Sequence, residues 1–446
     1  MKKYRKNKIF YKIIFFITFF VLITPIINAK IKGDNTTKKI LGNLSGRNND
    51  FPCYSINVSS SYDYGYNIGR LISSTIKKIN LLSHFIRNSN QNEMQDYAQK
   101  QIIVLKKYFP DELEELQGLS DYVHIKIKQL LILKKIINSY FSEQCTVTIS
   151  TGKATKNNQT FLTQNFDSKV TNIHSLFSMF LWRYFSYNLW VVRISTMRYT
   201  YAFFGVPIFR EMCVINEKGL AFGGNGIQYT SNTSQPIDEG EGLSLVSLRR
   251  LTMMTCKNVT EAENLWRNSP RESNRRDGIL TALYCDKEGN MVIIESTHSY
   301  FVAVYGNSTN MTHSCEDILW HTNHFIWLDP NLTGAIRPEG NPESVIRYQR
   351  SKELLEENYG NITLETCKEI CRDHQKGYVP NEKDSADICV HPYNNSFKIT
   401  TFSYIVLPET LTIYYTHRSP CNSRYICRNL TIPLTKDYPL LDYLLW

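Results

Sequence analysis

The stretch that decides the fold is "SEQCTVTISTGKATKNNQTFLTQNFDS", residues 142–168. From Thr146 polar and apolar residues alternate, which is the period of a strand with one buried face. A polar turn rich in Gly, Lys and Asn follows, and a second apolar run leads into Asp167. The stretch therefore predicts a β-hairpin with a cysteine, Cys145, at one end and a carboxylate at the other. These residues alone are compatible with a structural cysteine or with a nucleophile.

The segments on either side of this hairpin differ in character. Residues 62–141 carry apolar side chains three and four positions apart, which is typical of amphipathic helices. After Cys145 the apolar runs are strand-like, with Gly219 and Gly289 in hairpin turns. Further helices are expected near residues 244–255, 342–358 and 364–374, before a return to strands. Helices, strands, helices and strands in this order predict an α+β fold of stacked layers rather than parallel βαβ units.

The first 29 residues have the composition of a targeting signal. Six of the chain's basic residues lie there and no acidic residue does, so the formal charge on the remainder falls from +10 to +4. This remainder gives no support for nucleic-acid binding. The apolar run Ile13–Ile27 has 15 residues, fewer than the roughly 20 that span a bilayer as a helix. A signal peptide is favoured over an uncleaved anchor, and membrane attachment is expected only if the segment stays uncleaved.

Glycosylation motifs and cysteines agree with entry into the secretory pathway and a secreted, lysosomal or otherwise lumenal protein. Twelve Asn-x-Ser/Thr motifs occur, at Asn35, Asn43, Asn57, Asn158, Asn232, Asn258, Asn307, Asn310, Asn331, Asn361, Asn394 and Asn429. Eleven cysteines are present, so one free thiol would leave ten for up to five disulfides. In an exported chain, composition alone favours a disulfide role for Cys145.

Several ordered motifs reverse that preference. The segments "CTVTIS" and "TQNFDS" resemble the start of the catalytic chain in the acyl-coenzyme A:6-aminopenicillanate (isopenicillin-N) acyltransferase family. Further segments resemble this family in the same order: "FPDELEELQGLSD" (109–121), "NEKGLAFGGNGI" (216–227), "HTNHF" (321–325), "SVIRYQRSKELL" (344–355) and "DICVHP" (387–392). The family consists of cysteine N-terminal-nucleophile hydrolases. The resemblance implies a four-layer αββα sandwich.

The resemblance also implies a mechanism. The chain would cleave itself between Gln144 and Cys145, and the new α-amino group, with an ordinary pKa of about 7.7–8, would serve as the base for the Cys145 thiol. Asp167 would orient the terminal ammonium, and Asn323 would donate its amide N–H to the oxyanion. Asn225 and Asn165 are the residues expected to contact the substrate.

The other cysteines and histidines suggest no metal or organic cofactor. His321 and His324 form a lone His-x-x-His pair without further ligands, which is a poor metal signature. Cys367 and Cys371 lie four apart, so they face one side of a helix, where core packing or separate disulfides are more common than a metal site. Asp167 itself has a plainer alternative role as a turn cap.

Two departures from the family pattern bear on specificity. Gln144 stands where glycine is usual before the nucleophile, and no arginine occurs between Asp387 and Arg418, where the penicillin-forming members carry one. The expected substrate is therefore a different non-peptide amide, an N-acyl amine or N-acyl amino acid, hydrolysed through an acyl-Cys145 intermediate. Acyl transfer from a thioester to an amine, and a non-enzymatic lumenal glycoprotein that keeps the fold, are the alternatives.

The expected organisation has four parts. They are a signal peptide or anchor over residues 1–29, a polar leader over 30–61, a helical region over 62–144 and a catalytic chain over 145–446 that begins with Cys145. The two processed chains are expected to remain associated.

Overall fold

The computed structural model describes residues 53–86, 91–139, 143–170, 189–230, 237–273, 279–306, 316–374, 387–391 and 397–431. The expected signal peptide and the leader up to residue 52 lie outside these residues. Within the described ranges, no helix combines the length and hydropathy needed to cross a membrane.

The helical layer before Cys145 forms as the apolar spacing predicts. Its helices are α3 (Ser61–Ile86), α4 (Gln91–Tyr108), α5 (Pro110–Val123) and α6 (Ile127–Ser139). Pro110 occupies the first position of α5, with Asp111 and Glu112 in the first turn, where acids favour the helix N-terminus. The later helices are α8 (Leu245–Thr255), α9 (Val259–Asn268), α10 (Pro330–Thr333), α11 (Pro342–Glu357) and α12 (Leu364–Arg372). The sequence patterns predicted α8, α11 and α12 but not α9 or the four-residue helix α10.

The strands form two sheets. One has the order β1 (Cys53–Val58), β4 (Leu189–Ile194), β5 (Tyr201–Val206), β6 (Arg210–Asn216), β7 (Ala221–Ile227), β8 (Ile279–Cys285), β9 (Met291–Ser296) and β10 (Phe301–Tyr305). The other has the order β11 (Ile318–His321), β2 (Glu143–Gly152), β3 (Asn158–Val170), β12 (Phe397–Leu407), β13 (Thr412–Tyr415) and β14 (Ile426–Asn429). Strand β1 was not expected, because its residues fall in the predicted polar leader.

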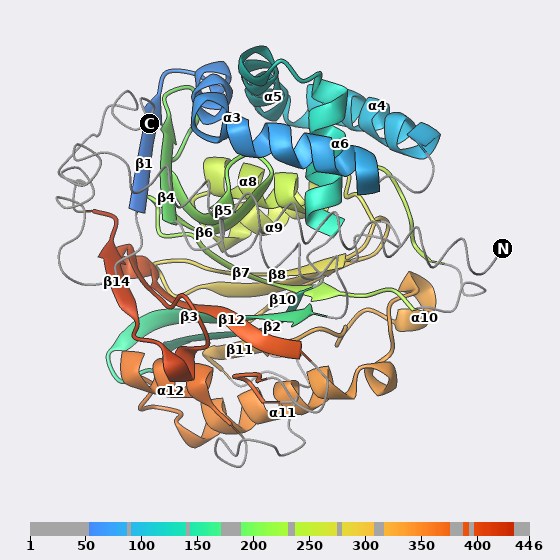
Figure 1. Ribbon diagram of the computed structural model, residues 1–446. Coiled ribbons are helices and arrows are strands. Elements are labelled where there is room, and N and C mark those ends of the chain that lie inside the picture. Colours follow the sequence, from blue (N-terminus) through green and yellow to red (C-terminus); the bar gives the residue numbers. More distant parts are fainter. Residues whose placement is uncertain are drawn as a thin grey trace. The chain divides into compact units, whose positions relative to one another are not determined.

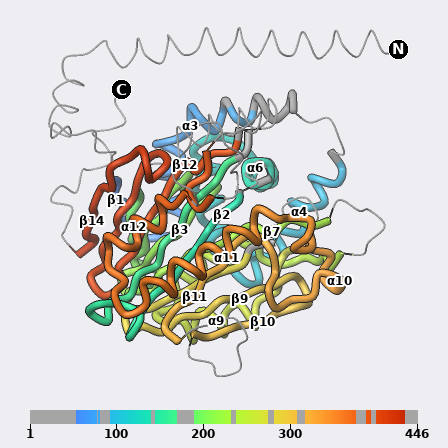
Figure 2. Tube along the Cα trace, turned by 90° about the horizontal axis from the view of Figure 1, so that it is seen from below, coloured from blue at the N-terminus to red at the C-terminus, as the bar shows by residue number. Residues whose placement is uncertain are grey.

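The elements stack in four layers, as Figure 1 shows. Helices α3 to α6, with α8 and α9, cover the outer face of the eight-stranded sheet, and α11 and α12 cover the outer face of the six-stranded sheet. Figure 2, a view from below, shows α11 and α12 lying across this second sheet. The expected α+β, four-layer αββα architecture is confirmed.

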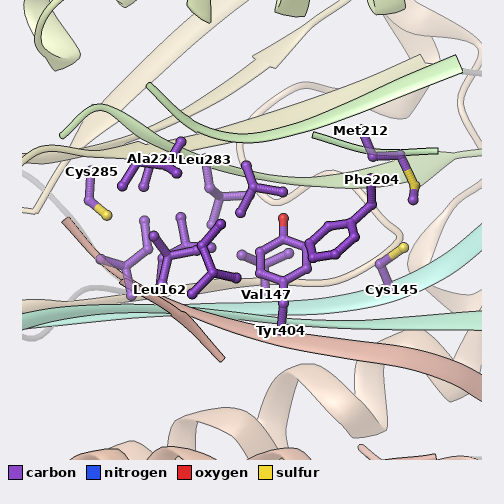
Figure 3. Packing of buried hydrophobic residues seen from close by; sticks show 14 of the residues in the cluster. Cys145, Val147, Leu162, Phe204, Met212, Ala221, Leu283, Cys285 and Tyr404 are labelled. Atoms are coloured by element: carbon purple, nitrogen blue, oxygen red, sulfur yellow. The ribbon is translucent and has the colours of Figure 1, made fainter. Parts of the chain in front are cut away.

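The core between the sheets is apolar and contains the nucleophile candidate. Cys145 packs there with side chains from both sheets, among them Val147, Leu162, Phe204 and Met212. Figure 3 shows the Cys145 side chain directed from the six-stranded sheet into this layer, near Phe204 and Met212. The alternation seen in the sequence therefore places Cys145 on the inner face of its strand.

A glycine pair lets the two sheets approach closely beside Cys145. A Cβ atom on Gly223 would lie 2.6 Å from Cγ1 of Val147, so a larger residue would push the sheets apart. The Gln164 side chain bridges the gap, donating from Nε2 to the Gly224 carbonyl (2.7 Å) and accepting from the Gly224 N–H (3.1 Å). This contact brings Asn225, the next residue of β7, over the start of β2.

A buried charge network joins the helical region to the catalytic region. Nη2 of Arg250 lies 2.8 Å from Oε2 of Glu115, and Nε lies 2.7 Å from Oε2 of Glu211. Glu112 lies 3.7 Å from Nη1 of Arg250 and pairs with Lys134. The side chains of Arg250 and of the three glutamates are at most 1% exposed. The network therefore connects residues on both sides of the Gln144–Cys145 bond.

This network predicts a stability that falls as the pH rises. Burial raises the pKa of Glu115 to about 8; Arg250 opposes the rise, and Glu211 and Glu112 add to it. The Glu115 carboxyl has a pKa near ~4.3 in the unfolded chain. Its contribution to the free energy of unfolding is therefore complete below that pH and is lost as the pH rises through about 8. We expect Tm to be lower at pH 8 than at pH 5 by roughly 5 °C. Glu115→Gln should flatten this difference in thermal scans.

The matched control for this prediction is Glu114→Gln. Glu114 lies next in sequence but is exposed, so its substitution should preserve the pH dependence. Equal pH profiles for Glu115→Gln and the parent protein would refute the assignment.

Candidate active site

The backbone of Cys145 is held by three side chains that are distant in sequence. Its N–H donates to Oδ1 of Asn323 (2.8 Å). Its carbonyl accepts from Nδ2 of Asn225 (2.9 Å) and from Nη1 of Arg347 (2.8 Å). All four residues are at most 2% exposed. Cys145 is thus fixed at both backbone polar groups, which is the rigidity that a nucleophile requires.

Asp167 lies beside this cluster on β3. Its Oδ1 accepts from Oγ1 of Thr400 (2.6 Å), and its Oδ2 lies 4.0 Å from Nη1 of Arg347. That Oδ2 atom is buried and accepts no hydrogen bond from the described residues. Burial raises the pKa of the Asp167 carboxyl, and Arg347 opposes the rise. A new cation near Oδ2 would therefore be stabilised.

Gln144, the residue expected at the cleavage site, is the cross-strand partner of Asp167. Gln144 and Cys145 are consecutive residues of the continuous strand β2. Removal of the chain up to Gln144 would therefore expose the Cys145 nitrogen at a position next to Asp167. This placement is consistent with the expected contact between Asp167 and the terminal ammonium.

Asn323 makes contacts that differ from its expected role. Its Oδ1 accepts from both Cys145 N and Nη2 of Arg347, and its Nδ2 donates to the Gly226 carbonyl (2.7 Å). The two donors at Oδ1 establish the orientation of the amide. In the uncleaved chain Asn323 therefore holds the nitrogen of Cys145, and donation to an oxyanion stays a prediction.

The two histidines around Asn323 have separate partners. Nε2 of His321 lies 2.9 Å from Oε1 of Glu295, whereas Nδ1 of His324 lies 2.8 Å from Oγ of Ser344. Burial lowers the pKa of His324 to about 3, which keeps this ring neutral. Ser344 also accepts from the Asn323 N–H (2.7 Å). Ser344 thus links the ring of His324 to the backbone of Asn323.

Arg347 is the site residue that sequence reasoning missed. It lies on α11, where Ser344, Arg347, Tyr348, Ser351 and Leu355 form the buried face. The signal available in the sequence was the position of this arginine on the helix face that the three- and four-residue spacing predicts to be buried. Arginine is rarely buried without a partner. Lys398 adds a second buried cation, 2.5 Å from Oε2 of Glu343. The site therefore carries more positive charge than the motifs alone suggested.

Asn165 is not brought to the Cys145 side chain. It pairs with Thr146, whereas Cys145 pairs with Phe166, so Asn165 lies on the opposite face of the sheet from the thiol. Its amide donates to the carbonyls of Cys371 (2.8 Å) and Ile388 (2.9 Å). Asn165 therefore links β3 to the end of α12 and to the 387–391 segment by hydrogen bonds.

A comparison with known protein families identifies the family of this chain. Residues 154–408, more than half of the chain, match the family model described as acyl-coenzyme A:6-aminopenicillanic acid acyl-transferase. The matched range includes Asp167, Asn225, Asn323 and Arg347 and begins after Cys145. None of the curated proteins matches the chain.

Similar solved structures include two bacterial enzymes. A mutant conjugated bile acid hydrolase from Clostridium perfringens is 13% identical, with 64% of this chain and 92% of that chain covered and a TM-score of 0.37. Penicillin V acylase from Agrobacterium tumefaciens is 12% identical, with 65% and 87% covered and a TM-score of 0.39. From the family match over residues 154–408, the chain belongs to the acyl-coenzyme A:6-aminopenicillanic acid acyl-transferase family.

Proposed function

We propose that this protein is a self-processing amidohydrolase that cleaves an N-acyl amine or N-acyl amino acid through an acyl-Cys145 intermediate. The observation that carries the proposal is the buried cluster in which Asn323, Asn225 and Arg347 hold the backbone of Cys145. A disulfide cysteine would not require this convergence of polar side chains on its two backbone groups. Family membership supports the class of chemistry, and the cluster supports Cys145 as its centre.

Self-cleavage begins with the Cys145 thiol. Its sulfur attacks the carbonyl carbon of Gln144, the C–N bond to Cys145 breaks, and the nitrogen takes up a proton to become a free amine. Water then hydrolyses the resulting thioester, leaving a carboxylate on Gln144 and regenerating the thiol. The new amine stays beside Asn323 Oδ1, its partner before cleavage, and beside the buried Oδ2 of Asp167.

Substrate turnover uses the same groups. The amine of Cys145 accepts the thiol proton as sulfur attacks the substrate carbonyl, and returns this proton to the departing amine. Asp167 orients the ammonium that forms in between. Water hydrolyses the acyl-thioester to a carboxylic acid and restores Cys145. Asn225 and Asn323 supply amide donors to the oxyanion once their present acceptors move.

The proposal is tested by trapping the intermediate. The purified protein is incubated with N-acyl amines and N-acyl amino acids of varied chain length, and amine release is followed by mass spectrometry. Brief incubation should add one acyl group to the peptide that begins with Cys145, and hydroxylamine should remove it as expected for a thioester. Amine release without acylation of this peptide would disprove the covalent route, and no release from any substrate would disprove amidohydrolase function.

Acyl transfer is the second candidate, because the matching family model is named for an acyl-transferase. In that reaction an amine instead of water attacks the acyl-Cys145 thioester. Adding increasing concentrations of an acceptor amine during turnover distinguishes the two reactions. Hydrolysis predicts a constant yield of free acid, whereas transfer predicts its replacement by a new amide.

Arg347 is expected to be necessary for both self-cleavage and turnover. Arg347→Met removes the donors to the Cys145 carbonyl and to Asn323, and should slow both reactions about 100-fold or more. Arg347→Lys retains the charge without the forked donor geometry, so only partial recovery is expected. The measurements are the rate of two-chain formation on denaturing gels and the kcat/KM for the substrate found above.

The control for Arg347 is Lys352→Met on the same helix. Lys352 is 43% exposed and lies 3.8 Å from Glu356, so its loss should change neither rate by more than about twofold. Thermal scans of each variant show whether the fold is retained. A folded Arg347→Met protein that is processed and active within threefold of the parent would remove Arg347 from the site.

We also propose that the protein matures in the secretory pathway. Six of the motif asparagines belong to the described chain, and each is exposed or half-exposed: Asn57, Asn158, Asn258, Asn331, Asn361 and Asn429. Such positions are accessible to glycosylation. Protein from a secretory host is expected to migrate faster after N-glycosidase treatment, whereas cytosolic protein beginning at residue 30 should not change. Identical migration of the secreted protein before and after treatment would contradict the proposal.

A further inference from the structure

Two histidines and two cysteines converge beside the C-terminal end of α12. They are His374, Cys389, His391 and Cys421, and their ligand atoms all lie within 4.8 Å of one another. We propose that these four side chains bind one zinc ion in a closed structural site. This site is separate from the cysteine chemistry proposed for Cys145.

The spacing of the atoms fits tetrahedral coordination. The sulfurs of Cys389 and Cys421 are 3.6 Å apart, and Nε2 of His391 lies 3.6 Å from the first and 3.1 Å from the second. With Zn–S bonds of about 2.3 Å and Zn–N bonds of about 2.0–2.1 Å, a tetrahedron has edges of about 3.8 Å between sulfurs and about 3.6 Å between sulfur and nitrogen. The observed distances are close to these edges, so a zinc ion requires only small side-chain adjustments.

An outer carboxylate supports the fourth ligand. Oδ2 of Asp387 lies 3.6 Å from Nδ1 of His374. A carboxylate at one ring nitrogen commonly orients a histidine whose other nitrogen binds a metal. The ring centroids of His374 and His391 are 4.9 Å apart, which places both imidazoles at the same centre.

Backbone contacts hold the three contributing segments in place. The Cys389 N–H donates to the Asp373 carbonyl (3.1 Å), and Nε of Arg372 donates to the Pro420 carbonyl (3.1 Å). The residue that follows α12, the 387–391 segment and the short helix Pro420–Asn422 are thereby fixed relative to one another. The ligands are therefore positioned by the fold rather than by flexible tails.

The ligand chemistry favours zinc over a disulfide. The sulfurs are farther apart than the 2.05 Å or so of a disulfide bond. A disulfide would also leave the two neighbouring imidazoles without a common ligand. Two thiolates and two neutral imidazoles balance the charge of Zn²⁺ and match its preference for sulfur and nitrogen ligands.

The site is connected to Asp167 through β12. The Val390 N–H donates to Oγ1 of Thr400 (2.7 Å), and the same hydroxyl donates to Oδ1 of Asp167. A zinc ion that fixes Cys389 and His391 would therefore also fix the hydroxyl that positions Asp167. This connection predicts that metal loss loosens the active site without removing any of its groups.

Zinc content and cobalt spectroscopy test the proposal on the full-length protein. Purified protein dialysed against metal-free buffer should contain about one zinc per chain, and Cys389→Ser and Cys421→Ser should reduce this at least tenfold. Asp387→Asn should weaken zinc affinity about 10- to 100-fold. Protein reloaded with Co²⁺ should show the strong d–d absorption of tetrahedral cobalt and a thiolate charge-transfer band, and His391→Cys should intensify that band.

Controls separate a specific site from general effects. Cys427→Ser and His124→Asn change an exposed cysteine and a helix-capping histidine, and both should keep the zinc. Peptide mapping without reduction reports the competing arrangement. A Cys389–Cys421 disulfide without zinc, zinc retained in both serine variants, or Co²⁺ bound without a thiolate band in the parent protein would each overturn the proposal.

Discussion

Replacing Cys145 with alanine is expected to leave the chain uncleaved and inactive. The parent protein should appear as two chains, the larger beginning at Cys145, because the thiol supplies the attack on the Gln144 carbonyl. Loss of a catalytic nucleophile can cost about 10⁶-fold in kcat, so activity should fall to the assay background. Intact-chain mass spectrometry and N-terminal sequencing of both proteins provide the measurement.

Two comparisons make this result specific to Cys145. Cys367→Ala removes another buried cysteine, which packs with the α11 and α12 residues, and should be cleaved and active if it folds. Cys145→Ser keeps a weaker nucleophile and should be cleaved slowly. In the alanine variant, a larger chain that begins at position 145 would show that a separate protease cuts the bond. A single uncleaved chain in the parent protein and in every variant would disprove the self-cleavage mechanism.

Replacing Arg250 with methionine is expected to separate or unfold the two processed chains. Tyr64, Glu112, Glu115 and Lys134 precede the cleavage point, whereas Arg250 and Glu211 follow it. The Tyr64 hydroxyl donates to Glu211 (2.9 Å), and Arg250 lies within ion-pair distance of all three glutamates. Removing this cation leaves buried carboxylates uncompensated, which costs about 3–5 kcal/mol. Size-exclusion chromatography with denaturing gels of each fraction measures chain association.

A surface lysine and a compensated variant test the cause. Lys257→Met removes a pair with Glu261 in which the lysine side chain is 53% exposed and the glutamate side chain 33%, so it should cost less than about 1 kcal/mol. Adding Glu115→Gln and Glu211→Gln to Arg250→Met replaces two of the buried carboxyl groups with neutral amides and should recover part of the stability. Chains that stay associated and equally stable in Arg250→Met would show that apolar packing alone joins them.

Motifs in the sequence were sufficient to locate most of the candidate site. The alternation from Thr146 predicted a strand with one buried face, and the family resemblance pointed to Asp167, Asn225 and Asn323. The structure brings Asn225 and Asn323 to the Cys145 backbone. Local patterns succeed here because each motif sits at a strand end or turn whose period is visible in a few residues.

Other members of the site depended on contacts that no local pattern contains. Arg347 reaches Cys145 across 202 positions of sequence, and α11 looks like an ordinary amphipathic helix until its buried face is known. The zinc ligands are spread over residues 374–421, and only Cys389 and His391 are near neighbours in sequence. Asn165 shows the same limit, because the face of β3 that it occupies follows from pairing with β2.

The amino-acid sequence by itself determined the order of helical and strand segments and the hairpin that carries Cys145, because hydrophobic period and turn residues act over a few positions. Its resemblance to the family implied the four layers and the class of chemistry. Only the tertiary structure decided which polar groups are buried together: Arg347 with Asp167, Arg250 with three glutamates, and two cysteines with two histidines. Burial of a charge is tolerated only beside its partner, and that partner is chosen by the packing of distant segments.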